Sequence, residues 1–266
     1  MNPHTDSCLG DGVSLDHLAV VMPAYNEAAG ITGFLREVHA SLVPLARRLE
    51  IIVVDDRSTD ATADVLRALD GELPGLSVVT ADVNRGHGPT ALTAYRAGLE
   101  RHPDLILHVD GDGQFDGSDL ARVVSAAVAT GADVVHGVRV GRTDPWFRRT
   151  LTACVGVLIA LAAGRRIPDV NTPLRSYRPS VLDVLIAAVP PDAQVPHVHF
   201  SLAEVRRGYD VRYVRVRSQP RRGGDEQGTM WGIETQRAPL LPPKRLREFT
   251  RTAVIELWRV SLRPGR

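Results

Sequence analysis

The chain has 266 residues, enough for one large α/β domain or for one domain with a C-terminal extension. With 44% hydrophobic and 24% charged residues, it is typical of a soluble globular protein. The formal net charge of +1 excludes a general attraction to nucleic acid, so any basic patch has to be local.

Cysteine usage and hydropathy favour a cytoplasmic protein. Cys8 and Cys154 are far apart and belong to no metal-spaced pair, which is typical of free thiols in a reducing compartment. The polar residues 1–16 predict a loose tail, and we recognise no signal peptide in them. The longest apolar run, residues 151–163, is well short of the roughly 20 residues that span a bilayer.

The first half of the chain alternates short β-branched runs with helical patterns. We predict strands at residues 18–22, 51–54, 76–80, 105–109 and 133–136. We predict helices at residues 27–40, 60–69, 90–101 and 118–130. This alternation is typical of βαβ units. It predicts a mostly parallel sheet that binds its ligands at the carboxyl ends of the strands.

After residue 140 the pattern becomes more helical. Helices are predicted at residues 147–163, 180–188 and 200–207, and a strand at 211–216. A loop rich in glycine and arginine follows at 219–228, and a basic amphipathic helix is predicted at 243–262. We therefore expect a tail at 1–16, one α/β domain at 17–232 and a C-terminal extension at 233–266.

Polar residues gather where four consecutive predicted strands end. The segments that follow these strands are PAYNE (23–27), DDRS (55–58), DVNRGHG (82–88) and DGDGQ (110–114). One polar strand end proves little, because strand ends are often polar. Four of them at the same edge of a sheet predict a ligand site.

The DGDGQ segment is the most informative of the four. Asp110 and Asp112 are one residue apart after a buried strand, so both carboxylates are able to face a hard divalent cation such as Mg²⁺ or Mn²⁺. Gln114 continues the alternation and offers a neutral oxygen, and Gly111 leaves room for a bulky ligand. An ordinary Asp-Gly turn is the structural alternative. The position of DGDGQ within the series of strand ends favours a metal site over an ordinary turn.

The order of these motifs resembles family 2 glycosyltransferases with the GT-A fold. Within that family it is most similar to the polyprenyl-phosphate (dolichyl-phosphate) mannosyl- and glucosyltransferases. The resemblance covers about residues 17–232, and it is strong through His136 and looser beyond. It implies a Rossmann-like, mostly parallel sheet flanked by helices. It also implies inverting transfer of a hexose from a GDP- or UDP-sugar.

The resemblance also implies roles for individual residues. The donor nucleotide-sugar would contact Pro23, Ala24, Tyr25, Glu27, Asp55, Asp56, Arg85, Gly88, Asp110 and Gly111. The cation would be held by Asp110, Asp112 and Gln114. Basic residues would surround an acceptor phosphate, namely Arg139, Arg148 or Arg149, and Arg175, and the resemblance marks Asp112, Arg139 and Arg175 as catalytic.

The glycine-bearing loop after the last strand predicts a lid. Arginines such as Arg221 and Arg222 would close over the diphosphate and exclude water; a solvated basic loop is the alternative.

An acceptor hydroxyl would need a general base, whereas a phosphate is already ionised. The late segment of the domain holds no acidic pair and offers only His197 or His199 as a base. Together with the arginines, this favours a polyprenyl phosphate acceptor.

Two departures from the family lie in the acceptor region. Asn171-Thr172-Pro173-Leu174-Arg175 replaces a glycine-containing segment, and Thr229-Met230 replaces the usual Ser-Lys pair. A hydroxyl on a small soluble metabolite therefore stays open as an alternative acceptor.

The predicted C-terminal helix has an apolar face of Leu246, Phe249, Ala253, Leu257 and Val260, flanked by Val254 and Trp258. Arginines fill much of the rest of its surface. Packing on the chain's own domain is the first interpretation. Peripheral contact with an anionic membrane is the second.

Three other functions agree less well with the sequence. A sugar nucleotidyltransferase and a Rossmann dehydrogenase would each have a glycine-rich loop after the first strand, where this chain has Ala24-Tyr25-Asn26-Glu27. A non-catalytic nucleotide-sugar-binding protein would be expected to lack the acids at 55–56 or at 110–112, and both pairs are present.

Overall fold

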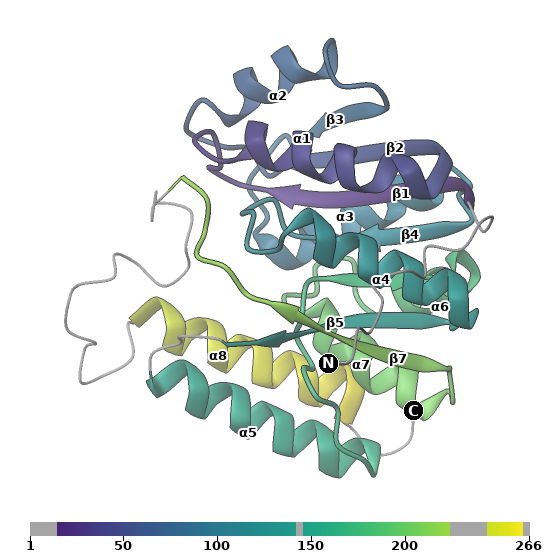
Figure 1. Ribbon diagram of the computed structural model, residues 1–266. Helices are drawn as coiled ribbons and strands as arrows, with labels where there is room; N and C mark the ends of the chain where they lie inside the picture. Colours follow the sequence, from purple (N-terminus) through teal and green to yellow (C-terminus); the bar gives the residue numbers. More distant parts are fainter. Residues whose placement is uncertain (1–14, 142–145, 224–243, 263–266) are drawn as a thin grey trace, which may run out of the picture.

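The computed structural model describes residues 15–141, 146–223 and 244–262. It contains a seven-stranded sheet in the order β3-β2-β1-β4-β6-β5-β7 (Figure 1). The strands are β1 (Leu15–Ala24), β2 (Ala46–Asp55), β3 (Leu76–Thr80), β4 (Leu105–His108), β5 (Val134–Val140), β6 (Arg175–Tyr177) and β7 (Val211–Arg217). Strand β6 runs antiparallel to both of its neighbours, and the other pairings are parallel.

The helices alternate with the strands through the first half of the chain and cluster in the second. They are α1 (Ile31–Leu42), α2 (Thr62–Asp70), α3 (His87–Leu99), α4 (Gly117–Thr130), α5 (Trp146–Ala163), α6 (Pro179–Ala187), α7 (Pro196–Arg206) and α8 (Lys244–Leu257). A short 3-10 turn, Val43–Leu45, leads into β2, and a π-helical turn, Trp258–Leu262, follows α8.

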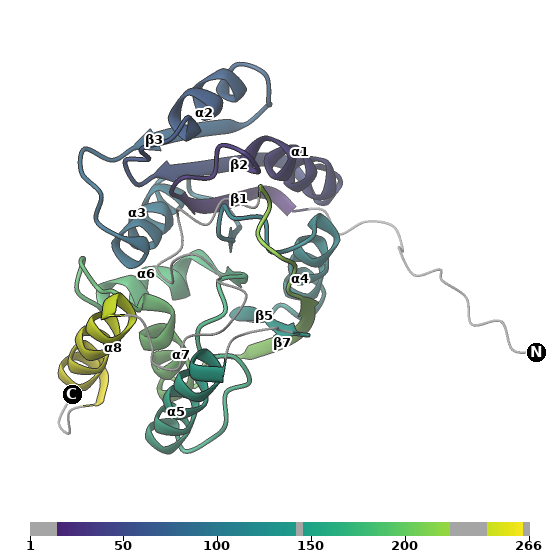
Figure 2. The ribbon, with the colours of Figure 1, turned by 90° about the vertical axis from the view of Figure 1, so that its left-hand side faces the viewer.

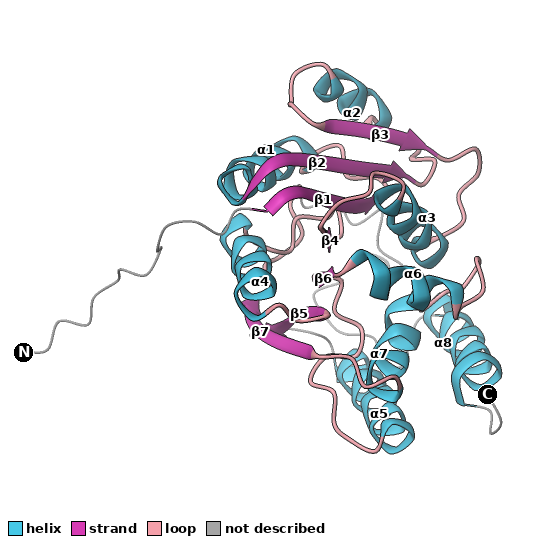
Figure 3. Ribbon diagram, turned by 90° about the vertical axis from the view of Figure 1, so that its right-hand side faces the viewer, coloured by secondary structure: helices cyan, strands magenta, loops and turns pink. Residues whose placement is uncertain are grey.

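Helices cover the sheet on both faces (Figure 3). Along β1, Leu18, Val20 and Met22 belong to the apolar cluster formed with α1, α2 and α4. The alternate residues Ala19 and Val21 belong to the cluster formed with α3, α6 and α7. Because successive side chains of a strand point to opposite faces, a strand buried on both faces is apolar throughout, as in the predicted parallel sheet.

Each strand predicted from the sequence is present, and β6 is the strand that the prediction missed. Its three residues, Arg175–Tyr177, lie between β4 and β5 and pair with Ile106–His108 on one side and Val134–His136 on the other. So short a segment has no periodicity of its own. Its extended conformation depends on partners about 40 and 70 residues away in the chain.

Several boundaries differ from the prediction, among them the starts of α1, which borders the site, and of β1. Helix α1 begins at Ile31 and not at residue 27, because residues 27–30 form a turn in which the Gly30 N–H donates to the Glu27 carbonyl at 3.0 Å. Strand β1 begins at Leu15, so the last two residues of the predicted tail belong to the sheet. The rest of that tail lies outside the described residues.

The C-terminal helix packs on the domain. Leu257 of α8 is 3% exposed and shares an apolar cluster with Ile159 of α5 and with Val198 and Leu202 of α7. Figure 2 shows α5, α7 and α8 together below the sheet. This outcome agrees with the first interpretation of the helix. Among the described helices, none has the length and hydropathy needed to cross a membrane.

Candidate active site

The carboxyl ends of the first strands are tied together by backbone hydrogen bonds. The Gly111 N–H donates to the Pro23 carbonyl at 3.0 Å, and the Asp56 N–H donates to the Ala24 carbonyl at 2.9 Å. Pro23 and Ala24 therefore lie between the DGDGQ turn and the aspartate pair that follows β2. A Cβ at Gly111 would lie 3.1 Å from the Pro23 carbonyl oxygen, so this position favours glycine.

Asp110 and Asp112 follow β4 and are partly shielded from solvent. Asp110 Oδ1 is buried and has no hydrogen-bond partner in the described part of the chain, and the imidazole Nε2 of His87 lies 3.7 Å away from it. Asp112 Oδ1 accepts a hydrogen bond from the Gln114 backbone N–H at 3.1 Å. Burial and the neighbouring charge of Asp110 raise the pKa of Asp112 to about 6.

These features fit a bound divalent cation. An unpartnered buried carboxylate oxygen is costly, and a cation is the partner that would compensate it. The described residues contain no cluster of three or more His, Cys, Asp or Glu side chains suited to a metal. A cation here would therefore be held by Asp110 and Asp112 and complete its ligand shell with ligand oxygens or water.

The two aspartates at the end of β2, Asp55 and Asp56, have different tasks. The Asp56 carboxylate accepts hydrogen bonds from the backbone N–H groups of Arg85 at 2.9 Å and Gly86 at 2.8 Å. It therefore fastens the loop before α3 to the end of β2. Asp55 Oδ1 accepts from the N–H and hydroxyl of Ser58, while its Oδ2 is buried without a partner among the described residues. Of the two, Asp55 has an oxygen free for a ligand N–H.

The PAYNE turn is held by side chains from the segment after β2. The Asn26 amide oxygen accepts the Thr59 N–H at 2.8 Å, and Asn26 itself has φ near +55°. The Glu27 N–H donates to the Thr62 hydroxyl at 2.7 Å, and the Ala28 N–H donates to Asp60 at 3.2 Å. These bonds fix the backbone on which Tyr25 and Glu27 stand.

A shallow pocket opens beside this turn, lined by Asn26, Glu27, Ala28, Ala29, Asp60, Ala61 and Arg222. Glu27 is buried. Its carboxylate accepts hydrogen bonds from Nε of Arg221, at 3.1 Å, and from a terminal nitrogen of the same guanidinium. Burial raises the pKa of Glu27 to about 7, although the hydrogen bond from Arg221 opposes this rise. A carboxyl group and a guanidinium from distant segments thus meet at the site.

Arg85 and Gly88 lie on the loop and helix start that follow β3. Arg85 is exposed and takes part through its backbone N–H. Gly88 is buried, and a Cβ there would lie 2.2 Å from the Ala193 carbonyl oxygen and 2.6 Å from that of Gln194. Gly88 is therefore required for packing against residues 193–194, which the resemblance alone did not indicate.

Arg139 lies at the end of β5 and is largely buried. Its Nε and a terminal nitrogen lie 2.8 and 3.0 Å from the two carboxylate oxygens of Asp169, and it also donates to the Asn171 carbonyl at 3.1 Å. Most of its donors are thus engaged within the protein. Arg148 and Arg149 belong to α5, but their side chains lie outside the described residues.

Arg175 does not face the site, which corrects the role expected for it. It is 0% exposed, and its guanidinium donates to the carbonyls of Thr172 and Val170 and to Ser201 Oγ at 2.8–3.0 Å. One nitrogen also lies 3.4 Å from Glu204 Oε1. A guanidinium so enclosed and saturated stabilises the fold and is unavailable to an acceptor phosphate.

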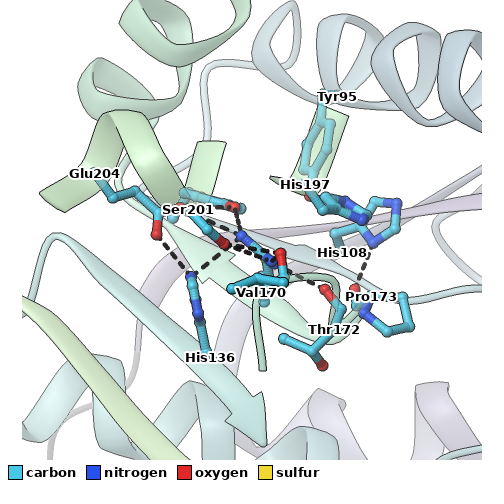
Figure 4. A network of polar contacts seen from close by, with 11 residues as sticks. Tyr95, His108, His136, Val170, Thr172, Pro173, His197, Ser201 and Glu204 are labelled. Carbon is cyan, nitrogen blue, oxygen red and sulfur yellow. Dashed lines mark hydrogen bonds and ion pairs between the residues drawn. The ribbon is translucent and has the colours of Figure 1, made fainter. Parts of the chain in front are cut away.

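His197 is also enclosed and is poorly suited to act as a base. Its Nε2 lies 2.9 Å from the Tyr95 hydroxyl, and its ring lies edge-on to that of His108 with the centroids 4.7 Å apart (Figure 4). Burial lowers the pKa of His197 well below its usual value and that of His108 to about 4. Both rings are therefore neutral, and neither is a strong proton acceptor.

His199 is a packing residue, which corrects the second base candidate. Its Nε2 lies 2.8 Å from Glu256 Oε1 and its Nδ1 lies 2.5 Å from Ser261 Oγ. Both partners belong to the C-terminal helical segment. The imidazole therefore joins α7 to that segment, and it has no free nitrogen for catalysis.

Residues 19–185 match the family model described as glycosyl transferase family 2. The match covers more than half of the chain. The chain belongs to glycosyltransferase family 2.

Curated relatives of this family 2 chain are undecaprenyl-phosphate 4-deoxy-4-formamido-L-arabinose transferases. The protein from Pseudomonas aeruginosa is 36% identical over 174 residues, 65% of this chain and 50% of the relative. That from Edwardsiella ictaluri is 33% identical over 179 residues, 67% of this chain and 54% of the relative. This chain thus matches about half the length of these relatives.

Solved structures share the GT-A fold of the family. Glucosyl-3-phosphoglycerate synthase from Mycobacterium tuberculosis aligns with a TM-score of 0.66 and 18% identity, covering 94% of this chain and 81% of that one. A mannosyltransferase from Pyrobaculum calidifontis, solved with GDP-Man and Mn²⁺, aligns with a TM-score of 0.60 and 20% identity, covering 96% and 68%. At such identities the likeness concerns the fold.

The structure brings together the family 2 motifs from the first four strands but separates them from Arg175 and His199. Sequence reasoning missed Asn26, Asp60 and Thr62, which shape the turn around Glu27. It also missed Glu37 on α1, which pairs with Arg222. The Ser-Thr-Asp run at 58–60 was a usable signal for the turn, because these side chains often bond to backbone groups. Glu37 had no such signal, because its partner is 185 residues away.

Proposed function

We propose that the protein is an inverting, metal-dependent hexosyltransferase that uses a nucleotide-diphosphate sugar, with a polyprenyl phosphate as acceptor. The observation that carries the donor part is the placement of Asp110 and Asp112 at the end of β4, with a buried unpartnered oxygen on Asp110. The aspartate pair after β2 and the turn that carries Glu27 border the same strand ends.

Asp110 and Asp112 would hold the cation, with Gln114 as a candidate further ligand. A bound divalent cation would stabilise the negative charge that develops on the departing diphosphate. The protein's own groups prepare the site for this ligand. The Gln114 N–H orients the Asp112 carboxylate, and Gly111 allows close packing of the turn against β1.

The other proposed contacts with the nucleotide-sugar involve residues after β2 and in the late loop. Asp55 Oδ2 is placed to accept an N–H from the nucleotide base, because Ser58 occupies only the other oxygen. The Asp56 carboxylate accepts hydrogen bonds from the Arg85 and Gly86 N–H groups, so the loop before α3 is held in place at one side of the proposed donor site. Arg221 of the late loop reaches the acids of the site through its contact with Glu27.

An acceptor phosphate suits these residues better than a hydroxyl does. A hydroxyl must lose its proton to a base, and the two histidines expected for that task are buried and bonded elsewhere. A phosphate oxygen attacks without a base. The bond between the anomeric carbon and the β-phosphate oxygen breaks, the nucleoside diphosphate leaves with the electron pair, and the new bond forms from the opposite face. The names of the relatives, which contain undecaprenyl phosphate, support this choice.

Exposed apolar side chains on α5 and α8 also support a lipid acceptor. On α5, Val157 is 60% exposed and Leu161 is 78% exposed. On α8 and the turn that follows it, Val254 is 47% exposed and Trp258 is 56% exposed. Exposed arginines lie close to them in the sequence, namely Arg165, Arg166, Arg251 and Arg259. Exposed apolar side chains with arginines near them in the sequence favour contact with an anionic bilayer.

Vesicle co-sedimentation tests the membrane contact. The full chain is expected to bind vesicles that contain anionic lipid more strongly than zwitterionic vesicles. Leu161→Asp and Trp258→Asp should weaken this binding, whereas Val43→Asp, at an exposed position next to α1, should leave it unchanged. Equal binding by all three variants and the parent chain would refute the contact. Point variants are preferable to removal of α8, because Leu257 is part of the core.

A transfer assay tests the function itself. UDP- and GDP-sugars would be supplied with Mn²⁺ or Mg²⁺, and either a short polyprenyl phosphate or a panel of small hydroxyl acceptors. We expect product with the lipid phosphate only, and loss of at least about 100-fold in kcat with Asp112→Asn. Asp64→Asn, which removes an exposed acid on α2, is the matched control. Product formed only on a small hydroxyl acceptor would overturn the acceptor assignment.

A further inference from the structure

Residues 218–223, which we call the strap, run from the end of β7 across the DGDGQ turn (Figure 1). The Gln219 N–H donates to the Gln114 carbonyl at 2.9 Å, and the Arg222 N–H donates to the Asp112 carbonyl at 3.0 Å. Arg222 Nε also donates to the Gly113 carbonyl at 3.1 Å. The strap is thus bonded to the backbone of the turn that carries the two acids.

The side chain of Arg222 is directed toward α1. Its guanidinium lies 2.6 Å from Glu37 Oε2 and 5.2 Å from the centre of the Phe34 ring. A Cβ on Gly30 or Gly113 would lie within 2.8 Å of Arg222 atoms, so both glycines make room for this arginine. Arg222 therefore anchors the strap. It does so through the ion pair with Glu37 and the cation–π contact with Phe34, in a space left by the two glycines.

The side chain of Arg221 is directed toward the acids of the site. It donates two hydrogen bonds, in a bidentate ion pair, to the buried Glu27 carboxylate. The charges of Asp112 and Asp110 act on both Arg221 and Glu27. Arg221 therefore pairs with the Glu27 carboxylate, and its positive charge also acts on Asp110 and Asp112, at the place where the cation and the diphosphate are proposed to bind.

We propose that Arg221 is the counter-ion of these acids in the free protein and moves to the diphosphate when donor and cation bind, while Arg222 keeps the strap attached to α1. This inference rests on the proposed function, because it takes the acids to be the cation site. It makes Arg221 a competitor of the cation and a binder of the diphosphate. Arg222 and Glu37 are positioning residues.

The assignment predicts effects of opposite sign for one substitution. Arg221→Gln should raise the affinity for Mn²⁺ alone, measured by electron paramagnetic resonance of the free ion, by roughly fivefold, because one competing positive charge is removed. The same variant should bind UDP or GDP in saturating Mn²⁺ roughly tenfold more weakly, because one charge-assisted contact is lost. Arg215→Gln removes the same charge from an exposed position on β7 and should change neither affinity.

The outcomes separate this inference from the proposed function. If Asp112→Asn abolishes Mn²⁺ binding but Arg221→Gln behaves like Arg215→Gln, the metal site stands and the role of Arg221 is refuted. If the parent chain binds no Mn²⁺, both are refuted. A fall in Mn²⁺ affinity with Arg221→Gln would refute the claim that Arg221 competes with the cation for the acids.

The anchor has its own test. Glu37→Gln should release Arg222 and weaken nucleotide binding, and trypsin should then cleave faster after Arg221 or Arg222. Glu72→Gln, which breaks an exposed ion pair with Arg36, is the matched control and should change neither result. Unchanged cleavage and unchanged nucleotide affinity in Glu37→Gln would refute the anchoring role.

Discussion

His199 on α7 and Glu256 on α8 form an ion pair that attaches the C-terminal helix to the domain, with Nε2 and Oε1 2.8 Å apart. The other carboxylate oxygen accepts the Gln194 N–H at 2.8 Å. Glu256 therefore connects α8 both to α7 and to the segment that precedes it. The contact holds in place the helix whose outer surface carries Val254 and Trp258.

This contact predicts that α8 loosens in acid. Burial alone would raise the pKa of Glu256, but the hydrogen bonds from His199 and from the Gln194 and Val195 N–H groups lower it below its usual value of 4.5. A lowered pKa stabilises the fold above pH 4.5, and this contribution is lost as the pH falls through the folded-state value. The protection factors of the α8 amides, which correct the exchange rates for their intrinsic pH dependence, should fall in that range. In Glu256→Gln these protection factors should be low at every pH; a variant that keeps the acid-dependent fall would contradict this account.

Asp112 should have opposite effects on stability with and without metal. Its pKa is raised to about 6, first by burial and then by Asp110, so the folded state favours the neutral form and the charge destabilises it above that pH. Asp112→Asn should therefore raise the melting temperature at pH 7 without metal, by about 2–4 °C. It should also abolish the further rise that Mn²⁺ with a nucleotide diphosphate produces in the parent chain. Differential scanning calorimetry measures both, and a lower melting temperature without metal would contradict the prediction.

Arg175 should matter for stability and not for acceptor binding. Its loss leaves Glu204 buried without its guanidinium partner, which costs about 3–5 kcal/mol of unfolding free energy. Urea unfolding of Arg175→Ala should show that loss. If the variant is too unstable to purify, Glu204→Gln offers the same test with a smaller change. A stable Arg175→Ala that merely fails to bind the acceptor would restore the role that the sequence suggested.

Asp56 should act on the donor site through the loop that it holds. Hydrogen bonds to a charged group contribute about 1.5–3 kcal/mol each, and Asp56 accepts two of them, from Arg85 and Gly86. Asp56→Ala should therefore lower the unfolding free energy and weaken nucleotide binding measured by calorimetry. Asp82→Asn, at an exposed position before the same loop, is the control. Normal nucleotide affinity in Asp56→Ala would show that the loop keeps its shape without the carboxylate.

The sequence by itself determined the sheet and the donor part of the site. Apolar runs such as 18–22 and 51–54 are buried on both faces wherever they pair, so their pattern predicts parallel strands without knowledge of their partners. Asp110 and Asp112 were recognisable because both follow one strand within four residues. The spacing of the motif made it recognisable, although Pro23 of β1 and the strap also hold its turn in place.

The tertiary structure decided which of the other charged residues face the site. Arg175 and His199 carry the same groups as catalytic residues, but Glu204 and Glu256 bind them in the interior. Arg221 and Arg222 are adjacent in the chain, yet one pairs with Glu27 and the other with Glu37 on α1. The reason is physical: a charged side chain takes the role that its partners allow, and these partners come from segments that only folding brings together.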